Sequence, residues 1–387
     1  MSKKANGEGS ISKYGDKWRG QLTIGRDATT GKIKRKTFYG KTKKEVDLKL
    51  QDYKLKLNKS ELPTDDKITF EQWYYTWLFD FRIHDLKPST FEKYYGIYNN
   101  YVLNSTIGSM KIVDIRSTHI QRYFNSLLEE GKTAERVKGI KRYINAGFHA
   151  ALKHGYINKN YCTNTTLPKV IKEDKITVLT KDEQKIFLDG INKHKLKCAF
   201  YLALGTGLRQ GELLALKWSD ISFKDNTVSI TKSIKRVTFI DKEGNKESKI
   251  IEQQPKTETS IRVVPIPQNV ITILKEHKKK QNELRLKQGE LYSNLDYIFC
   301  NEYGLPIDSK KLTRNLQSVL KSLDITPIPF HGLRHTYATR LFEKGVPIKT
   351  VQVLMGHKDI QTTMNIYTHV MEDEKNKAIE QINDIFG

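Results

Sequence analysis

Short blocks in the second half of the chain carry residues that could do chemistry together. Arg209 follows a Gly-Thr-Gly-Leu run, His331 and Arg334 stand three positions apart, and His357 and Tyr367 come after them. Planar guanidinium groups match the oxygens of a phosphate in pairs, imidazoles move protons near neutral pH, and a deprotonated tyrosine can attack a phosphodiester. The set therefore predicts phosphoryl transfer.

Each of these residues also has an ordinary structural interpretation when it is taken alone. Arg209 could form a surface salt bridge, His357 could be a structural histidine, and Tyr367 could belong to a core. His331 and His335 could bind zinc as a pair, but no Cys, Asp or Glu nearby completes a ligand set. The sequence also shows no carboxylate cluster suited to two metal ions, so we expect cationic side chains to do the work of Mg²⁺ and predict no cofactor.

The segments around these residues must bring them to one place. An apolar helix end at 199–204 runs into two glycines, which let the backbone turn sharply before Arg209 opens the next helix. The spacing of His331 and Arg334 puts both on one side of a helix or tight turn. Strands are expected near Thr227–Thr231 and Ser260–Ile266, with residues 241–250 as a long polar hairpin loop.

Composition narrows the class of protein. The 387 residues include 67 Lys and Arg against 44 Asp and Glu, a net charge of +23 that a polyanion such as nucleic acid would neutralise. No apolar run is long enough to cross a bilayer, and the first ten residues have no apolar core of a signal peptide. Three widely spaced cysteines fit reduced thiols. We therefore expect a cytoplasmic protein without a membrane partner.

The first sixty residues form the most basic part of the chain, with 17 Lys and Arg against 6 Asp and Glu. Alternation over 17–24 predicts a strand with Trp18 and Leu22 inward, and 32–39 predicts a second, very basic strand. Thr42 and Glu45 have the spacing of a capping box that opens a helix. A small sheet with one bracing helix could enter a DNA groove, and the alternative is a solvated basic surface. The candidate DNA contacts are Lys17, Arg19, Lys34, Arg35 and Lys36.

A polar segment at 58–67 predicts a linker, after which the pattern becomes helical as far as residue 162. Phe70, Trp73, Tyr74 and Trp77 form one stripe that is more typical of a core than of a surface for stacking bases. Further helices are expected at Ser117–Glu130 and Ala134–His154. Lys138, Lys141 and Arg142 could contact phosphates, or form a solvated face. A second linker is expected at Tyr161–Lys175.

The motifs together resemble the tyrosine recombinases, the phage integrase family. The resemblance rests on Thr-Gly-Leu-Arg-x-x-Glu-Leu ending at Leu213, His-x-x-Arg-His-Thr ending at Thr336, Leu-x-Gly-His ending at His357, and Tyr367 ten residues later. Within the family the chain resembles integrases of conjugative transposons most. The implied fold is multidomain α+β: a three-stranded sheet plus helix (1–60, arm-type DNA-binding), an all-helical core-binding domain (68–162), and a mostly α catalytic domain with a small antiparallel sheet (175–387).

The resemblance also implies roles for single residues. Arg209 and Arg334 would clamp the scissile phosphate, and Tyr367 would attack it to form a 3′-phosphotyrosyl link. His331 is implied as a proton acceptor or phosphate contact, and His357 as a hydrogen-bond donor to the phosphate.

The family also uses a lysine in a β-hairpin turn as general acid for the leaving oxygen. Lys256 stands in that place, just before the strand at 261–266, whereas Lys232 and Lys235 are less well placed. Glu212 is expected to orient the arginines rather than to catalyse.

The implied activity is site-specific recombination of a mobile element in the bacterial cytosol, without metal or ATP. The implied partners are double-stranded DNA at core and arm sites, a Holliday junction, a homo-tetramer on DNA, and accessory DNA-bending or excision factors. The acidic stretch 371–387 would join subunits in the tetramer, or pack on its own domain. A type IB-like topoisomerase and a non-catalytic DNA-binding regulator are the alternatives.

Overall fold

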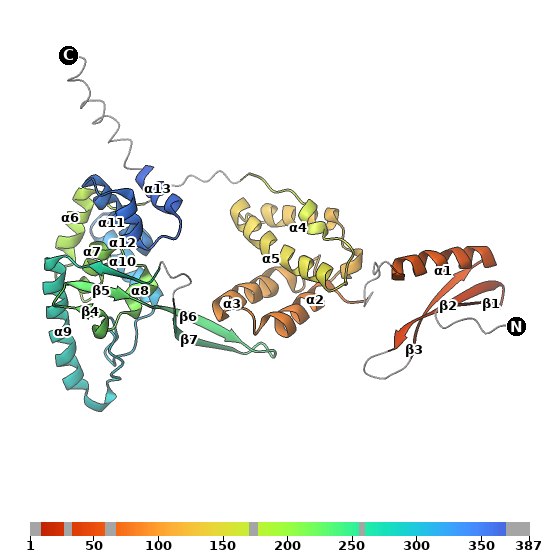
Figure 1. Ribbon diagram of the computed structural model, residues 1–387, viewed down its shortest axis with the longest axis horizontal. Helices are drawn as coiled ribbons and strands as arrows, with labels where there is room; N and C mark the ends of the chain where they lie inside the picture. Colours follow the sequence, from red (N-terminus) through yellow and green to blue (C-terminus); the bar gives the residue numbers. More distant parts are fainter. Residues whose placement is uncertain (1–8, 27–32, 59–66, 170–176, 255–259, 369–387) are drawn as a thin grey trace, which may run out of the picture. The chain divides into compact units, whose positions relative to one another are not determined.

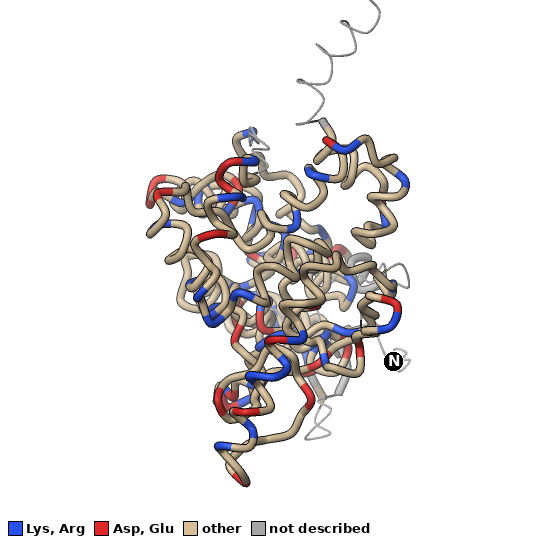
Figure 2. The backbone as a smooth tube through the Cα atoms, turned by 90° about the vertical axis from the view of Figure 1, so that its left-hand side faces the viewer, with Lys and Arg blue, Asp and Glu red and all other residues tan. Residues whose placement is uncertain are grey.

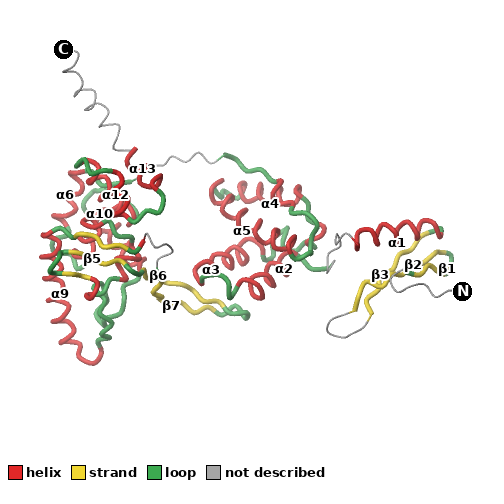
Figure 3. Tube along the Cα trace, viewed as in Figure 1, coloured by secondary structure: helices red, strands yellow, loops and turns green. Residues whose placement is uncertain are grey.

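The computed structural model describes residues 9–26, 33–58, 67–169, 177–254 and 260–368 (Figure 1). It separates into two compact units, Met1–Ile171 and Lys172–Gly387. Helices and strands occur in both units (Figure 3). The mixed α+β class is therefore the one that the sequence predicts.

A three-stranded antiparallel sheet and one helix form the N-terminal part of the first unit. The strands lie in the order β1 (Ser10–Tyr14), β2 (Lys17–Arg26), β3 (Ile33–Gly40), and helix α1 (Lys43–Asn58) follows them. Leu22 from β2 packs with Val46 and Leu50 from α1, and the half-buried Trp18 lies against them. This arrangement confirms the predicted sheet with one bracing helix.

Helix α1 begins at the predicted cap. The Thr42 Oγ1 accepts a hydrogen bond from the Glu45 backbone N–H at 3.2 Å. The Glu45 carboxylate accepts one from the Lys41 backbone N–H at 2.9 Å, one residue further back than in a regular capping box. Both bonds satisfy backbone donors that the helix itself cannot satisfy.

The described residues 67–169 of the first unit form helices joined by turns. Its elements are α2 (Phe70–Thr76), η1 (Trp77–Arg82), α3 (Pro88–Ile97), η2 (Tyr98–Val102), η3 (Ile112–Asp114), α4 (Ser117–Glu129), α5 (Ala134–Lys153) and η4 (Tyr161–Asn164). The predicted aromatic stripe is core: Phe70 stacks on Phe148 with ring centroids 4.1 Å apart, and the indole N–H of Trp73 donates to the Gly147 carbonyl at 2.9 Å. These rings are therefore not available to stack on bases.

The second unit packs helices around a small antiparallel sheet. Its elements are α6 (Lys181–Gly190), α7 (Lys197–Thr206), α8 (Gln210–Ala215), η5 (Trp218–Asp220), β4 (Ile221–Ser222), β5 (Thr227–Ile230), β6 (Ser233–Ile240), β7 (Lys246–Gln253), β8 (Arg262–Pro265), α9 (Gln268–Gln288), η7 (Gly289–Leu291), α10 (Ser309–Ser322), α11 (Phe330–Glu343), α12 (Ile348–Met355) and α13 (Ile360–Thr368). Strands β4, β5 and β8 form the sheet, with Val228 of β5 opposite Val264 of β8. The two predicted strands are thus confirmed.

The hairpin β6–β7 is inserted between β5 and β8 and projects from the rest of its unit (Figure 1). Ile240 pairs with Lys246, so the turn covers only 241–245. The prediction of a loop over 241–250 was therefore wrong at 246–250. A two-stranded ribbon exposes most side chains to water, so the polar start of β7 has the composition of a loop.

Lysines and arginines occur all along the chain, with acidic residues between them (Figure 2). Among the described residues, no helix combines the length and the apolar character that crossing a bilayer requires. Over the same ranges, no three His, Cys, Asp or Glu side chains gather as they would around a metal ion.

Candidate active site

A tight turn between two helices presents Arg209. Helix α7 ends at Gly207, whose φ of 62° is left-handed. A side chain at Gly207 would meet Tyr337, because an added Cβ would lie 2.3 Å from the ring carbon Cδ1. Only glycine fits such a turn. The turn places Arg209 at the N-cap position of α8.

Arg209 is held at both ends. Its backbone N–H and its guanidinium Nη1 donate to the Glu212 carboxylate at 2.9 and 2.7 Å. Its Nη2 donates to the Gly356 carbonyl, just after α12, at 3.1 Å. The Arg209 side chain nevertheless remains 36% exposed, whereas that of Glu212 is only 6% exposed. The guanidinium is therefore fixed in direction but open to an anion from solvent.

Arg334 joins the same two helix ends from the middle of α11. Its Nη1 donates to the Gly207 carbonyl at 2.7 Å, and its Nη2 donates to the Met355 carbonyl. The residue is buried, and within the described residues its Nε has no acceptor. Each Nη nitrogen keeps a second N–H that can bind a phosphate oxygen. The two arginines thus meet at one junction, although they are 125 residues apart in sequence.

Two histidines of α11 lie beside Arg334. His331 and His335 are one turn apart, with ring centroids separated by 4.5 Å and planes at 89°. His331 keeps an exposed edge, but partial desolvation, followed by the charges of Arg334 and Arg209, lowers its pKa. His331 is therefore neutral at pH 7 and able to accept a proton.

His357 follows the left-handed Gly356 that ends α12. Its Nδ1 lies 2.9 Å from the Thr363 hydroxyl, and its carbonyl accepts from the Gln352 amide at 3.1 Å. Burial, followed by the charges of Arg334 and Arg209, lowers its pKa to about 3. If Nδ1 accepts a hydrogen bond from the Thr363 hydroxyl, the ring proton is on Nε2, and this N–H can donate to a phosphate oxygen.

Tyr367 lies on α13, beside this cluster. Its half-buried ring packs edge-on against Phe342 of α11, with centroids 4.9 Å apart. Phe342 lies eight residues beyond Arg334, about 12 Å along the helix. Within the described part of the chain, no hydrogen bond joins the Tyr367 hydroxyl to the arginines or histidines.

The lysine predicted to be the general acid does not lie on any of the helices described so far in this section. Lys256 lies outside the described residues. Of the two alternatives, Lys232 is 3.5 Å from the Asp220 carboxylate in an ion pair, and Lys235 is exposed on β6.

Arg262 on β8 belongs to the cluster but was not predicted. Its Nη2 and Nη1 donate to the two oxygens of Glu212 at 2.9 and 3.3 Å, and its Nε donates to the Leu354 carbonyl at 2.9 Å. The residue is buried on the same side of the strand as Val264. An arginine at an inward position of an otherwise apolar strand is the signal that could have identified it.

The cluster has more cations than its carboxylate can neutralise. Burial alone would raise the pKa of Glu212, but hydrogen bonds from Arg262 and the charges of Arg262 and Arg209 lower it below its usual value. Glu212 is thus ionised, one negative charge among three arginines. Burial, and then the charge of Arg209, lowers the pKa of Arg334 to about 9. An anion bound here would relieve that repulsion.

The candidate DNA contacts in the N-terminal sheet divide between its two faces. Arg35 lies opposite Thr23 and Arg19 opposite Tyr39, on the face away from α1, where Arg19 also covers the Tyr14 ring at 4.7 Å. Lys17 lies two residues before Arg19 on the same strand and therefore shares its face of the sheet. Lys36 lies opposite the buried Leu22 and faces the Tyr53 ring of α1 at 6.0 Å, so it belongs to the other side. The Lys34 side chain lies outside the described residues.

The candidate contacts on α5 also differ in their surroundings. Lys138 and Arg142 are exposed and stand four residues apart, so they share one face of the helix. The Lys141 ammonium donates to the Thr165 carbonyl. Lys141 therefore has a structural hydrogen-bond partner, and among the described residues no such bond is seen for Lys138 or Arg142.

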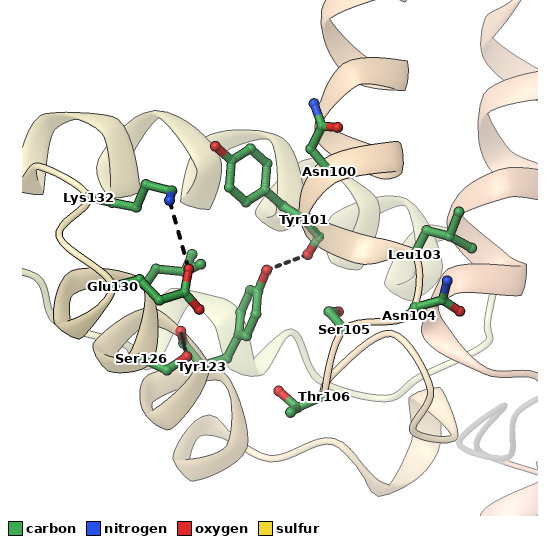
Figure 4. A pocket seen from close by; sticks show the side chains of 11 residues that line it. Asn100, Tyr101, Leu103, Asn104, Ser105, Thr106, Tyr123, Ser126, Glu130 and Lys132 are labelled. Atoms are coloured by element: carbon green, nitrogen blue, oxygen red, sulfur yellow. Dashed lines mark hydrogen bonds and ion pairs between the residues drawn. The ribbon is translucent and has the colours of Figure 1, made fainter.

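A polar cavity of about 470 Å³ lies in the helical part of the first unit (Figure 4). The Tyr123 hydroxyl donates to the Tyr101 carbonyl at 2.5 Å, and Glu130 pairs with Lys132 at 3.8 Å. No His or Cys lines the cavity, and its single carboxylate is paired. It offers no acid–base set, so the arginine cluster is the candidate active site.

The arginine cluster lies in a part of the chain that matches a known family. Residues 177–374 match the model described as Phage integrase family, and residues 69–128 match that of the phage integrase N-terminal SAM-like domain. The chain is 43% identical, over 395 residues and the full length of both chains, to a XerC-like tyrosine recombinase of Caldanaerobacter subterraneus subsp. tengcongensis.

Two solved structures share the fold. The Tn1549 transposon integrase in complex with transposon right end DNA has a TM-score of 0.65 at 21% identity, covering 82% of this chain and 100% of that chain. A lambda integrase tetramer bound to a Holliday junction has a TM-score of 0.56 at 21% identity, covering 91% of this chain and 96% of that chain.

Proposed function

The chain belongs to the phage integrase family and is a tyrosine-type site-specific recombinase, and from this premise we propose that Tyr367 is its nucleophile. The Tyr367 hydroxyl oxygen attacks the scissile phosphorus, a 3′-phosphotyrosyl bond forms, and the bond to the 5′ oxygen breaks. The 5′ oxygen takes up a proton and leaves as a hydroxyl. The covalent bond keeps the energy of the phosphodiester, so attack by a 5′ hydroxyl can rejoin the strand.

The meeting of Arg209 and Arg334 at the ends of α7 and α12 is the observation that carries this proposal. Both guanidinium groups are directed by backbone carbonyls, at Gly356 for one and at Gly207 and Met355 for the other. Preorganised cations stabilise the charge that grows on the non-bridging oxygens in phosphoryl transfer. We assign the clamp to this pair.

The reaction needs one base, one acid and a hydrogen-bond donor: the Tyr367 hydroxyl loses a proton, the leaving 5′ oxygen gains one, and a non-bridging oxygen accepts a hydrogen bond. His331 is neutral and can take the Tyr367 proton, and His357 can donate to a non-bridging oxygen. Lys256 is the general acid in this scheme and protonates the leaving 5′ oxygen. The pairing of Lys232 with Asp220 and the exposure of Lys235 favour that choice over the two alternatives.

The other modules hold the DNA in the same proposal. Residues 1–60 bind arm sites with the sheet face that carries Arg19 and Arg35, and residues 68–162 hold the core site with Lys138 and Arg142. Four copies exchange strands through a Holliday junction, joined by the acidic stretch 371–387, with accessory proteins setting direction. The fold that the chain shares with the lambda integrase tetramer supports this assembly.

Covalent trapping tests the nucleophile. The substrates are labelled duplexes from the ends of the mobile element that the recombinase acts on. Each duplex is nicked beside the cleavage point, so that the short fragment with the freed 5′ hydroxyl diffuses away. The duplexes are mixed with the protein and run on a denaturing gel. We expect a protein–DNA band that survives EDTA and is absent with Tyr367→Phe. A band of equal strength with the Phe variant would mean that another residue attacks the phosphate.

A further inference from the structure

Arg262 has no role in the chemistry assigned so far, yet it is the most enclosed partner of the active-site carboxylate. Its side chain is 5% exposed, and it contacts both oxygens of Glu212. The oxygen Oε1 of Glu212 also accepts from Arg209 Nη1, and Oε2 from the Arg209 backbone N–H. Glu212 is therefore a bridge between two arginines rather than the counterion of one.

The difference in exposure between the two arginines indicates how the charge of Glu212 is shared. Arg209 is 36% exposed and can turn its charge to an incoming anion, whereas Arg262 cannot. A carboxylate that faced Arg209 alone would cancel its charge, and the two oxygens would compete with a phosphate for the same N–H groups. With Arg262 in place, Arg209, Arg262 and Glu212 together keep a net charge of +1.

A second hydrogen bond joins Arg262 to the end of helix α12, close to the carbonyl that Arg209 contacts. Its Nε donates to the Leu354 carbonyl in the last turn of α12. Two residues later, the Gly356 carbonyl accepts from Arg209. Arg262 therefore contacts Glu212 directly, and it also contacts the last turn of the helix whose end carries the Gly356 carbonyl.

We propose that Arg262 is a positioning residue for strand cleavage: it occupies the carboxylate of Glu212 so that Arg209 stays cationic toward the scissile phosphate. The inference rests on the proposed function, in which Arg209 binds that phosphate. It assigns to Arg262 a charge-balancing action, which differs from a purely architectural one. An architectural arginine would be needed whatever the charge of residue 212.

A double-variant experiment separates the two actions. Cleavage of a nicked trapping substrate is timed under single-turnover conditions for the wild type, Arg262→Met, Glu212→Gln and the double variant. Removing Arg262 alone should slow cleavage about 10²-fold, the size found when one preorganised group is lost from an active site. The double variant should recover at least about tenfold of that loss, since no carboxylate then cancels Arg209. A double variant as slow as Arg262→Met, or slower, would overturn the proposal.

Arg262→Lys keeps the argument testable even where the Met variant unfolds. Lysine retains the charge and most of the stem but not the two-pronged contact. Charge balance predicts cleavage within about tenfold of the wild type, given the 10²-fold expected for full loss. Cleavage slowed by 10²-fold or more in Arg262→Lys, with DNA binding and melting temperature retained, would point to geometry alone and contradict the proposal.

A methylphosphonate at the scissile position provides a readout that a structural role would not move. It removes one negative charge from the substrate, so the benefit of a cationic Arg209 shrinks. The ratio of wild-type to Arg262→Met rates should fall on this substrate, and an unchanged ratio would contradict charge balance.

The control variant is Arg236→Met, which breaks a 2.7 Å ion pair with Asp308 in the same unit. It should cleave like the wild type. If it slows as Arg262→Met does, the loss at Arg262 is a general effect of removing an ion pair, and the proposal fails.

The proposed function fails in a different way from this inference. If the wild type forms no covalent product, or Tyr367→Phe forms it equally, the nucleophile assignment is wrong. If the wild type cleaves and the Phe variant does not, the rates of the Arg262 variants decide the inference alone.

Discussion

The arginines of the proposed active site are oriented mainly by neutral groups. Arg334 donates to the carbonyls of Gly207 and Met355, and Arg209 donates to that of Gly356. A carbonyl dipole directs a guanidinium without cancelling its charge, so full cations remain for the phosphate. Glu212 is the exception, and Arg262 offsets it.

The buried imidazole of His357 makes stability depend on pH. Its pKa is lowered to about 3 in the folded chain, against 6.5 ordinarily. Below pH 6.5 the unfolded chain binds a proton that the folded chain does not, so stability falls as pH falls toward 3. Between pH 7.5 and 5, the wild type should lose about 2 kcal/mol more unfolding free energy than His357→Gln. Urea unfolding at both pH values measures this difference.

Other groups titrate in both proteins, so only the difference between the two curves counts. Parallel curves would show that His357 has the same pKa in the folded and unfolded chains. A steeper fall for the Gln variant would reverse the sign, and would mean that the folded site favours the imidazolium.

At the scale of the elements, one helix end matters most. Gly207→Ala would add a Cβ in a left-handed residue and press it against Tyr337. Gly345, with a φ of 72°, is a matched control, because an added Cβ there meets nothing within 4 Å. Gly345→Ala should cost about 1 kcal/mol in unfolding free energy, the price of the left-handed backbone alone. Gly207→Ala should lower the unfolding free energy by more than this, and it should also slow cleavage because the Gly207 carbonyl directs Arg334. Equal losses of unfolding free energy in the two variants, with cleavage unchanged, would contradict this prediction.

The sequence predicts the elements that local patterns determine. The helix cap at Thr42, the aromatic core stripe and the α7 end before Arg209 all depend on residues within a few positions of one another. Arg262 escaped prediction because its partner Glu212 lies 50 residues away, and only the fold brings them together. Likewise, the side of the sheet that Lys36 faces follows from its position opposite Leu22, a pairing that a basic run does not reveal.

At the scale of the whole molecule, a net charge of +23 favours a partner of opposite sign. For a recombinase that partner is DNA, and binding releases counterions from each phosphate that a cation contacts. The structure distinguishes basic residues by what they face. Those on an open face, such as Arg35, are free to reach phosphates, whereas Lys36 is directed toward α1.

The neighbours Arg35 and Lys36 make a matched pair for this distinction, because they differ in face but hardly in position. In the full chain, Arg35→Gln should reduce the slope of log affinity against log salt on arm-site DNA by about 0.9, the value for one phosphate contact. Lys36→Gln should leave the slope unchanged, since its ammonium lies against the Tyr53 ring on the α1 side. Fluorescence anisotropy over a KCl series measures both slopes. If Lys36→Gln lowers the slope as much as Arg35→Gln does, DNA does not select the open face of the sheet, and this part of the chain binds DNA by charge alone.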